Sequence, residues 1–249
     1  MDGTDREPLA NGEAREVTTQ IVQLPPKHLP ANVWRSGAEM QGAREFRRKT
    51  GLDYESMVGH LVDTAEVQPG IRALDVETGT GFIARQLSIR IGPTGRVVGV
   101  DESDVQVEHA RLGAKSAGLT MRAEWRIASA AKLPFDDEEF EIVTCGAVFH
   151  RLPTSEFLSE AHRVLKPSGR LIIADEIKSP AGVFTAWLTL LNTYERLIRR
   201  EPVNPNERFF NAEEIVDRLS SAGFSQIVVK GLQARNRRGR AFSLIKAVK

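Results

Sequence analysis

The residues with the clearest chemical pattern form a glycine-rich turn and an acid that follows it. The turn spans residues 75–81 (DVETGTG), and Asp101 ends the next apolar segment. Glycines let the backbone approach a ligand closely, and free N–H groups at a helix start attract a negative group. A carboxylate about twenty residues further on is typical of the group that takes both ribose hydroxyls of an adenosine-containing cofactor. The pattern therefore predicts a site for a nucleoside between two strand ends.

The turn by itself leaves two other interpretations open. Residues 79–84 (GTGFIA) also satisfy the G-x-G-x-x-A pattern of nicotinamide-dinucleotide folds, with Asp101 in the expected place. A tight strand-to-helix turn that holds no ligand is the second alternative. Asp75 argues against a nicotinamide enzyme, because such an enzyme needs no acid ahead of the glycines. An acid there can orient the turn or meet a cationic group.

Strand and helix periods alternate around the turn, which indicates an α/β fold. Short apolar strands are expected at residues 72–76, 96–100, 123–127, 139–144 and 170–174, with helices between them. The helix after the second strand has Ser103 as its N-cap and ends at Gly118. Alternation of this kind predicts a doubly wound, mostly parallel sheet with helices on both faces. Two closing strands, 226–230 and 241–248, are joined by a short basic loop and must be antiparallel.

Two stretches beyond the turn carry a family resemblance. Residues 133–137 (LPFDD) and 139–143 (EFEIV) resemble the loop and fourth strand of class I S-adenosylmethionine-dependent methyltransferases, and residues 161–171 (AHRVLKPSGRL) resemble the stretch before the fifth strand. The resemblance covers roughly residues 69–174 and is nearest to the ubiquinone/menaquinone-biosynthesis type. It implies a Rossmann-like, doubly wound, seven-stranded sheet with an antiparallel last strand, and S-adenosylmethionine as the cofactor.

The resemblance also implies a role for individual residues. The backbone of residues 78–81 lines the methionine part of the cofactor, Asp101 binds the ribose, and Glu102 lies against the adenine. Ser129 and Ala130 match the positions that contact the adenine edge, and Cys145 borders the methyl-transfer pocket, although a small buried hydrophobe explains Cys145 equally well. The expected cofactor-binding residues are Asp75, Glu77, Thr78, Gly79, Gly81, Asp101, Glu102, Ser129, Ala130 and Cys145.

Three of these residues depart from the family pattern. Glu77 replaces the first glycine of the turn, so it is strained if that position needs a positive φ, and otherwise its carboxylate can face the methionine ammonium. Ser129 replaces an aspartate, and Glu102 is polar where an apolar residue is more common. The departures motivate an alternative hypothesis, a catalytically silent, methyltransferase-like binding or scaffold subunit.

The residues that would contact the molecule receiving the methyl group are less clearly indicated by the sequence. His150 follows the fourth strand, where the pocket should open, and is expected to act as a catalytic base or to bind substrate; a loop histidine bonded to the backbone is the competing interpretation. An apolar helix at residues 181–199 suits a cover over a small, apolar or aromatic substrate, and suits core or a homodimer face as well. The basic cluster at residues 235–240 is expected to be a solvated loop, with a site for an anionic substrate or partner as the less favoured alternative. No spacing of ligand side chains indicates a metal.

Composition limits the classes of protein that remain. The chain of 249 residues carries a net charge of +1, which gives no general attraction to nucleic acid or membrane. Cys145 is the single cysteine, so neither an intramolecular disulfide nor a cysteine-based zinc site is expected. We expect a flexible tail at residues 1–30, a helical lid at 31–68, and a methyltransferase domain at 69–249 with a helical insertion at about 178–210. The first residues do not resemble a signal peptide, and a cytoplasmic location is expected.

Overall fold

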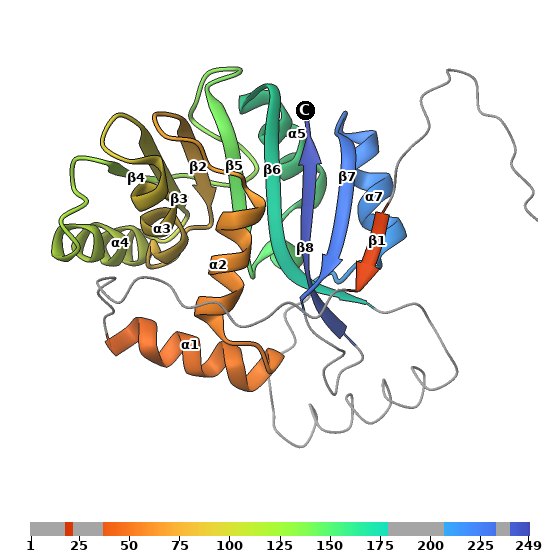
Figure 1. Cartoon of the computed structure of the whole chain (residues 1–249), viewed down its shortest axis with the longest axis horizontal. Helices are drawn as coiled ribbons and strands as arrows, with labels where there is room; N and C mark the ends of the chain where they lie inside the picture. The colour runs from red at the N-terminus through yellow and green to blue at the C-terminus, as the bar shows by residue number, and fades with distance from the viewer. Residues whose placement is uncertain (1–17, 22–36, 179–206, 233–239) are drawn as a thin grey trace, which may run out of the picture.

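Eight strands form one sheet in the computed structural model, which describes residues 18–21, 37–178, 207–232 and 240–249 (Figure 1). The strands are β1 Thr18–Ile21, β2 Arg72–Val76, β3 Arg96–Asp101, β4 Ala123–Ile127, β5 Phe140–Gly146, β6 Leu165–Lys178, β7 Ser225–Gly231 and β8 Arg240–Val248. Their order is β1-β7-β8-β6-β5-β2-β3-β4, and β8 is antiparallel to both of its neighbours. The remaining pairs are parallel. The predicted fold class is therefore confirmed.

One strand was not predicted. β1 lies within the segment expected to be a tail, and it pairs in parallel with the outer edge of β7, with Thr18 opposite Val228. A four-residue segment with two threonines, a glutamine and an isoleucine carries no alternation long enough to be recognised. Its strand conformation is supported by hydrogen bonds to β7, which the sequence of β1 alone does not specify.

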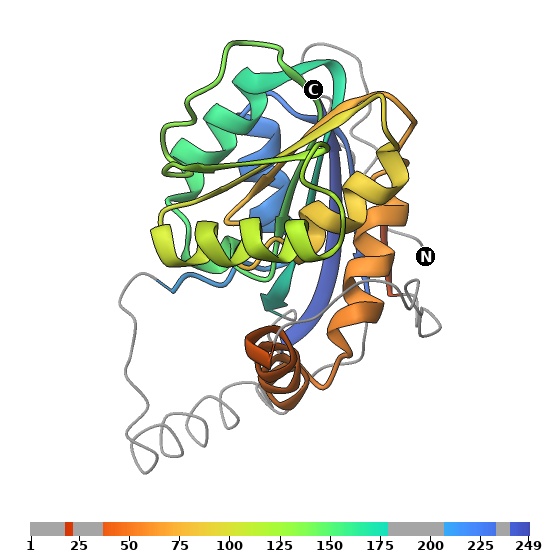
Figure 2. The same ribbon diagram turned by 90° about the vertical axis from the view of Figure 1, so that its left-hand side faces the viewer.

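Helices cover both faces of the sheet (Figures 1 and 2). The helices are α1 Gly37–Thr50, α2 Tyr54–Thr64, α3 Phe82–Ile91, α4 Asp104–Ser116, α5 Thr154–Val164 and α7 Ala212–Ser221, with a 3-10 turn η1 at Phe149–Arg151. α2, α3 and α4 lie on one face, and α5 and α7 lie on the other (Figure 2). Each face has its own apolar cluster, the first built from α5, α7 and the strands and the second from α2, α3 and the strands. The central strands are buried on both sides, which explains their continuous apolar runs.

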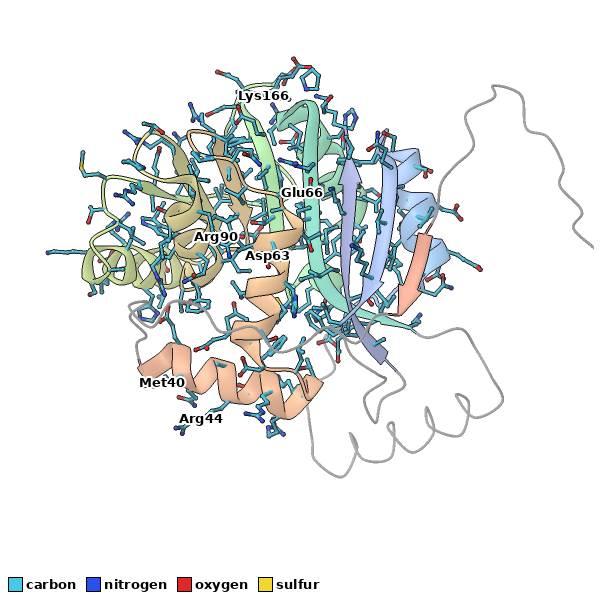
Figure 3. All side chains as sticks on the ribbon, in the orientation of Figure 1. Met40, Arg44, Asp63, Glu66, Arg90 and Lys166 are labelled. Atoms are coloured by element: carbon cyan, nitrogen blue, oxygen red, sulfur yellow. The ribbon has the colours of Figure 1, made fainter. Side chains whose placement is uncertain are left out.

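Helix α2 is fixed to the sheet and to α3 by apolar packing and by ion pairs. Met57, Leu61 and Val62 of α2 are buried in the second cluster. Asp63 of α2 pairs with Arg90 of α3 at 3.0 Å, and the two side chains face each other in Figure 3. Glu66, just after α2, pairs with Arg170 and Lys246 on neighbouring strands.

Parallel strands bring their carboxyl ends to one edge of the sheet. The glycine turn and Asp101 lie at this edge. β2, β3, β5 and β6 end there, and α1 lies beyond that edge (Figure 1). Ligands of doubly wound sheets bind at such an edge, where successive connections leave the sheet on opposite faces. The predicted insertion at 178–210 and the basic loop at 235–240 lie outside the described residues, apart from their ends. No helix in the described part of the chain is long and apolar enough to span a bilayer.

Candidate functional site

Asp75 is the structural centre of the glycine turn. Its side chain is buried, and it accepts hydrogen bonds from the hydroxyls of Thr78 (2.6 Å) and Thr144 of β5 (2.7 Å) and from the backbone N–H of Ala84. Burial raises the pKa of Asp75 to about 6, while these hydrogen bonds oppose the shift. The carboxyl group thus joins β2, β5 and the first turn of α3. Of the two roles open for Asp75, the geometry favours orientation of the turn.

The glycines of the turn have different neighbours. Gly81 has φ +76° at the N-cap of α3, and a Cβ added there would lie 2.5 Å from a ring carbon of Trp125. Gly79 has φ +54°, and a Cβ added there would meet no atom within 4 Å. Gly81 is therefore required by packing within the protein, whereas Gly79 borders open space from which a ligand can approach the backbone.

Asp101 lies beside the turn, as the spacing predicted. Its Oδ2 accepts from the backbone N–H of Gly79 at 2.9 Å, and its Oδ1 accepts from the N–H of Ser103 at 2.9 Å. A carboxylate offers about four acceptor positions. Because two are used by the backbone, Asp101 keeps the capacity to accept from two further hydroxyls. The backbone N–H of Thr78 also donates to the carbonyl of Val100, which fixes the spacing of the two strand ends.

Glu77 occupies the strained conformation that was one of its two expected alternatives. Its φ is +55°, in the left-handed region that side chains with a Cβ rarely adopt. Burial raises the pKa of Glu77 to about 7, with the negative charges of Asp101 and Glu102 adding to the rise and Arg151 opposing it. Glu102 itself is exposed. The turn therefore carries a strained, half-buried acid among other acids.

The remaining residues that are expected to bind the cofactor lie after β4 and near the end of β5. Ser129 uses its hydroxyl to accept from the backbone N–H of Ala131 at 3.3 Å, so it holds its own loop, and Ala130 is buried in the first apolar cluster. Cys145 of β5 is fully buried. Burial raises the pKa of the Cys145 thiol, and the carboxylates of Asp175, Asp75 and Glu77 raise it further. Cys145 is thus a packed, protonated side chain at a position between the turn and the end of β6.

His150 is held by an acid that the sequence interpretation missed. Asp175 of β6 is buried, and its two carboxyl oxygens lie 2.9 and 3.0 Å from His150 Nδ1. Oδ2 also accepts from the backbone N–H of His150 at 2.6 Å. The imidazole stacks on Phe209, with ring centroids 4.6 Å apart. Asp175 directly follows the predicted strand 170–174, which is the same signal that identified Asp101 at the end of an earlier strand.

A second missed pair joins the N-terminal helix to the turn. Arg85 of α3 is fully buried, donates from Nη1 to the carbonyl of Thr80 at 2.7 Å, and forms an ion pair with Glu39 of α1. Next to this pair is a cavity of about 370 Å³ lined by residues of α1, α2, α3 and α4 and of the glycine turn. Its lining residues are Glu39, Gly42, Ala43, Phe46, Tyr54, Thr80, Phe82, Gln106 and His109. Three aromatic rings therefore face a space that begins at the glycine turn.

Comparison with known proteins supports the assignment that this geometry suggests. The family model described as "Methyltransferase domain" matches residues 74–173. A ubiquinone/menaquinone biosynthesis C-methyltransferase of Ectopseudomonas mendocina is 35% identical over 115 residues, which cover 46% of this chain and 45% of the relative. The chain thus matches about half the length of that relative.

Solved structures agree on the fold. A SAM-dependent methyltransferase from Aquifex aeolicus is similar with a TM-score of 0.56 at 22% identity, covering 77% of this chain and 88% of the other. The [4+2]-cyclase SpnF is similar with a TM-score of 0.64 at 20% identity, covering 79% and 82%. At these identities the likeness shows the fold alone, and the cyclase illustrates that this fold hosts more than one reaction. Residues 74–173 thus match a methyltransferase domain, and the relatives that this part of the chain resembles include a ubiquinone/menaquinone biosynthesis C-methyltransferase.

Proposed function

We propose that the protein is an S-adenosylmethionine-dependent methyltransferase that acts on a small, apolar or aromatic molecule. The observation that carries the proposal is the open space over Gly79, bordered by the spare acceptor capacity of Asp101, within a domain of the methyltransferase family. The residues fit the cofactor, because a nucleoside with an amino-acid tail needs a carboxylate for its ribose and a backbone that can be approached closely.

Different residues of the chain would bind different parts of the cofactor. The backbone of residues 78–81 would hold the methionine part, Asp101 the ribose hydroxyls, and Glu102 one face of the adenine. Ala130 would contact the adenine edge, while Ser129 would contribute less there because its hydroxyl accepts from Ala131. Cys145 would form part of the pocket floor. S-adenosylmethionine supplies an activated methyl group when bound, so the protein has mainly to align the acceptor and exclude water.

Glu77 would contribute electrostatics at this site. The strained carboxylate lies near Asp101 and Glu102, so the turn is a region of negative potential. The methionine tail carries an ammonium and the sulfonium carries a second positive charge, and both would be attracted to these acids. The negative potential supports a cationic ligand better than the pyrophosphate of a nicotinamide dinucleotide.

The cavity beside the turn supports an apolar or aromatic acceptor. Phe46, Tyr54 and Phe82 line a space of about 370 Å³, which suits a planar ring system. His150 is the candidate catalytic residue. Its contact with Asp175 of β6 brings it to the same sheet edge as the turn, because Cys145 of β5 lies opposite both Val76 of β2 and Ile173 of β6.

Isothermal titration with S-adenosylhomocysteine and S-adenosylmethionine tests this function. We expect both to bind, and we expect Asp101→Ala to weaken binding by about 10- to 100-fold because ribose hydrogen bonds to a charged acceptor are worth about 1.5–3 kcal/mol. Asp101→Asn, which keeps one carbonyl oxygen, should weaken binding less. Absence of binding at millimolar concentration, or a fluorescence change with NADH in its place, would contradict the proposal.

A further inference from the structure

One ring nitrogen of His150, Nδ1, is held by the protein, whereas the other, Nε2, has no recorded hydrogen bond to the described residues. Nδ1 lies within 3.0 Å of both oxygens of Asp175, and the ring is stacked on Phe209. The backbone is held as well, because the N–H of His150 donates to Asp175 and its carbonyl accepts from the N–H of Arg208. Among the described residues, no hydrogen bond to Nε2 is recorded, and 17% of the side chain is exposed.

This arrangement determines which ring nitrogen carries the proton. A carboxylate accepts hydrogen bonds and cannot donate them when it is ionised, so Nδ1 must be the donor in the contact with Asp175. In a neutral imidazole the other nitrogen then bears the lone pair. The lone pair of Nε2 is consequently directed away from Asp175, and the stacking on Phe209 restrains rotation of the ring.

The position of Asp175 is itself fixed by several contacts. Asp175 is buried and also accepts from the backbone N–H of Glu176 at 2.7 Å. Its pairing in the sheet, opposite Ser243 of β8, fixes the backbone from which it extends. Arg151, next to His150, is exposed, and its positive charge acts on Glu77 of the glycine turn. The negative charge of Asp175 would stabilise an imidazolium formed beside it, which is what a base requires.

We propose that Asp175 is a positioning residue that holds His150 with Nε2 unprotonated, and that the methyl acceptor therefore carries a proton that must be removed, on an oxygen or on an acidic carbon. The proposal rests on the proposed function and narrows it to a substrate class. A loop histidine that serves only to hold the backbone would need its N–H and carbonyl contacts, and would not need both carboxyl oxygens at Nδ1.

The step balances without a further reagent. The proton of the acceptor passes to His150 Nε2, and the electron pair left on the acceptor forms the bond to the methyl carbon. The sulfur keeps the pair of the bond that breaks and loses its positive charge. The positive charge moves to the imidazolium beside Asp175 and leaves when Nε2 returns its proton to water.

The tautomer can be measured directly on the full chain without a substrate. In ¹H–¹⁵N correlation spectra of histidine-labelled protein at about pH 8, above the ordinary pKa of imidazole, we expect the ring of His150 to show a protonated Nδ1 and a free Nε2. His150→Gln assigns the signal, and His162→Gln, on α5, is the matched control. A protonated Nε2 in the wild-type protein would overturn the proposal.

Asp175→Asn tests the positioning role. The asparagine amide can donate to Nδ1 and thereby favour the opposite tautomer, so we expect the His150 signal to move toward a protonated Nε2. An unchanged His150 tautomer in a folded Asp175→Asn protein would overturn the positioning role. S-adenosylhomocysteine titration separates the two hypotheses, because failure to bind in the wild-type protein refutes the proposed function even where the tautomer is as expected.

Turnover gives a second readout with 1,4-dihydroxynaphthalene as the probe acceptor. For Asp175→Asn and His150→Gln we expect kcat to fall at least about 100-fold, the usual scale of a positioned base, with S-adenosylhomocysteine affinity within twofold of wild type. A fall of less than threefold in both variants would overturn the proposal. An equal loss of cofactor affinity would also overturn it, because it would show a purely structural role.

Discussion

Two buried aspartates at the carboxyl edge of the same sheet have different partners. Asp75 of β2 accepts from two threonine hydroxyls and a backbone N–H. None of these donors has a second nitrogen that could act as a base. Asp175 of β6 accepts from backbone N–H groups and from an imidazole, whose other nitrogen is left available. In the function that we propose, the first acid fixes the wall of the cofactor site, and the second orients a histidine that would act as a base. A buried carboxylate alone therefore does not identify a catalytic residue, because its donors decide the role.

The largest effect on stability is expected at Asp75. Asp75→Ala would leave Thr78, Thr144 and the Ala84 N–H without their acceptor, at about 1–3 kcal/mol each, so we expect a loss of about 3 kcal/mol or more in the free energy of unfolding. Urea denaturation measures the loss. Thr144→Val removes one of the donors and should cost only about 1 kcal/mol. Equal losses of stability in the two variants would show that Asp75 does not connect β2, β5 and the first turn of α3.

A smaller effect of opposite sign is expected at Glu77. Glu77→Gly would relieve the positive φ, and we expect the free energy of unfolding to rise by about 0.5–1 kcal/mol after the entropic cost of glycine is subtracted. The same variant should bind S-adenosylmethionine more weakly, because a carboxylate is lost from the turn. A gain in stability together with a gain in affinity would show that Glu77 has no electrostatic role in binding.

A separate effect of Glu77 is its contribution to the pH dependence of stability. Its pKa is raised from 4.5 to about 7 in the folded protein, so the folded state binds more protons than the unfolded state between these values. Stability should therefore fall as pH rises from about 4.5 to about 7, and Glu77→Gln should flatten this fall. Thermal unfolding across that range measures it. Parallel pH profiles for the two proteins would show that burial does not perturb Glu77.

Much of the framework was predictable from local pattern, because the central strands are buried on both faces and are bounded by turn residues. Residues 72–76 were predicted as a strand and form β2, and Ser103 is the N-cap of α4 as expected. β6 is longer than the predicted 170–174, since its pairing extends from Leu165 and, beyond Ala174, continues along β8. Extension of this kind depends on a partner strand, so the strand's own sequence cannot indicate it.

The site was only partly predictable for the same reason. Gly79 and Asp101 could be paired in advance because the distance between them in the sequence follows from a single strand-helix-strand unit. His150 lies on the connection after β5 and Asp175 lies on β6, and only the pairing of β5 with β6 in the sheet brings them together. Arg85 has the sequence pattern of an ordinary helix-surface residue, and its burial follows from the positions of α1 and α4.

The most direct test of the cofactor site is a titration of Gly79→Ala with S-adenosylhomocysteine beside wild type. A Cβ at Gly79 meets no protein atom within 4 Å, so it would occupy only the space assigned to the ligand and would cost about 1 kcal/mol of backbone strain. We predict a folded protein with binding weakened at least about tenfold, equivalent to about 1.4 kcal/mol. Wild-type affinity in a folded Gly79→Ala protein would contradict the account.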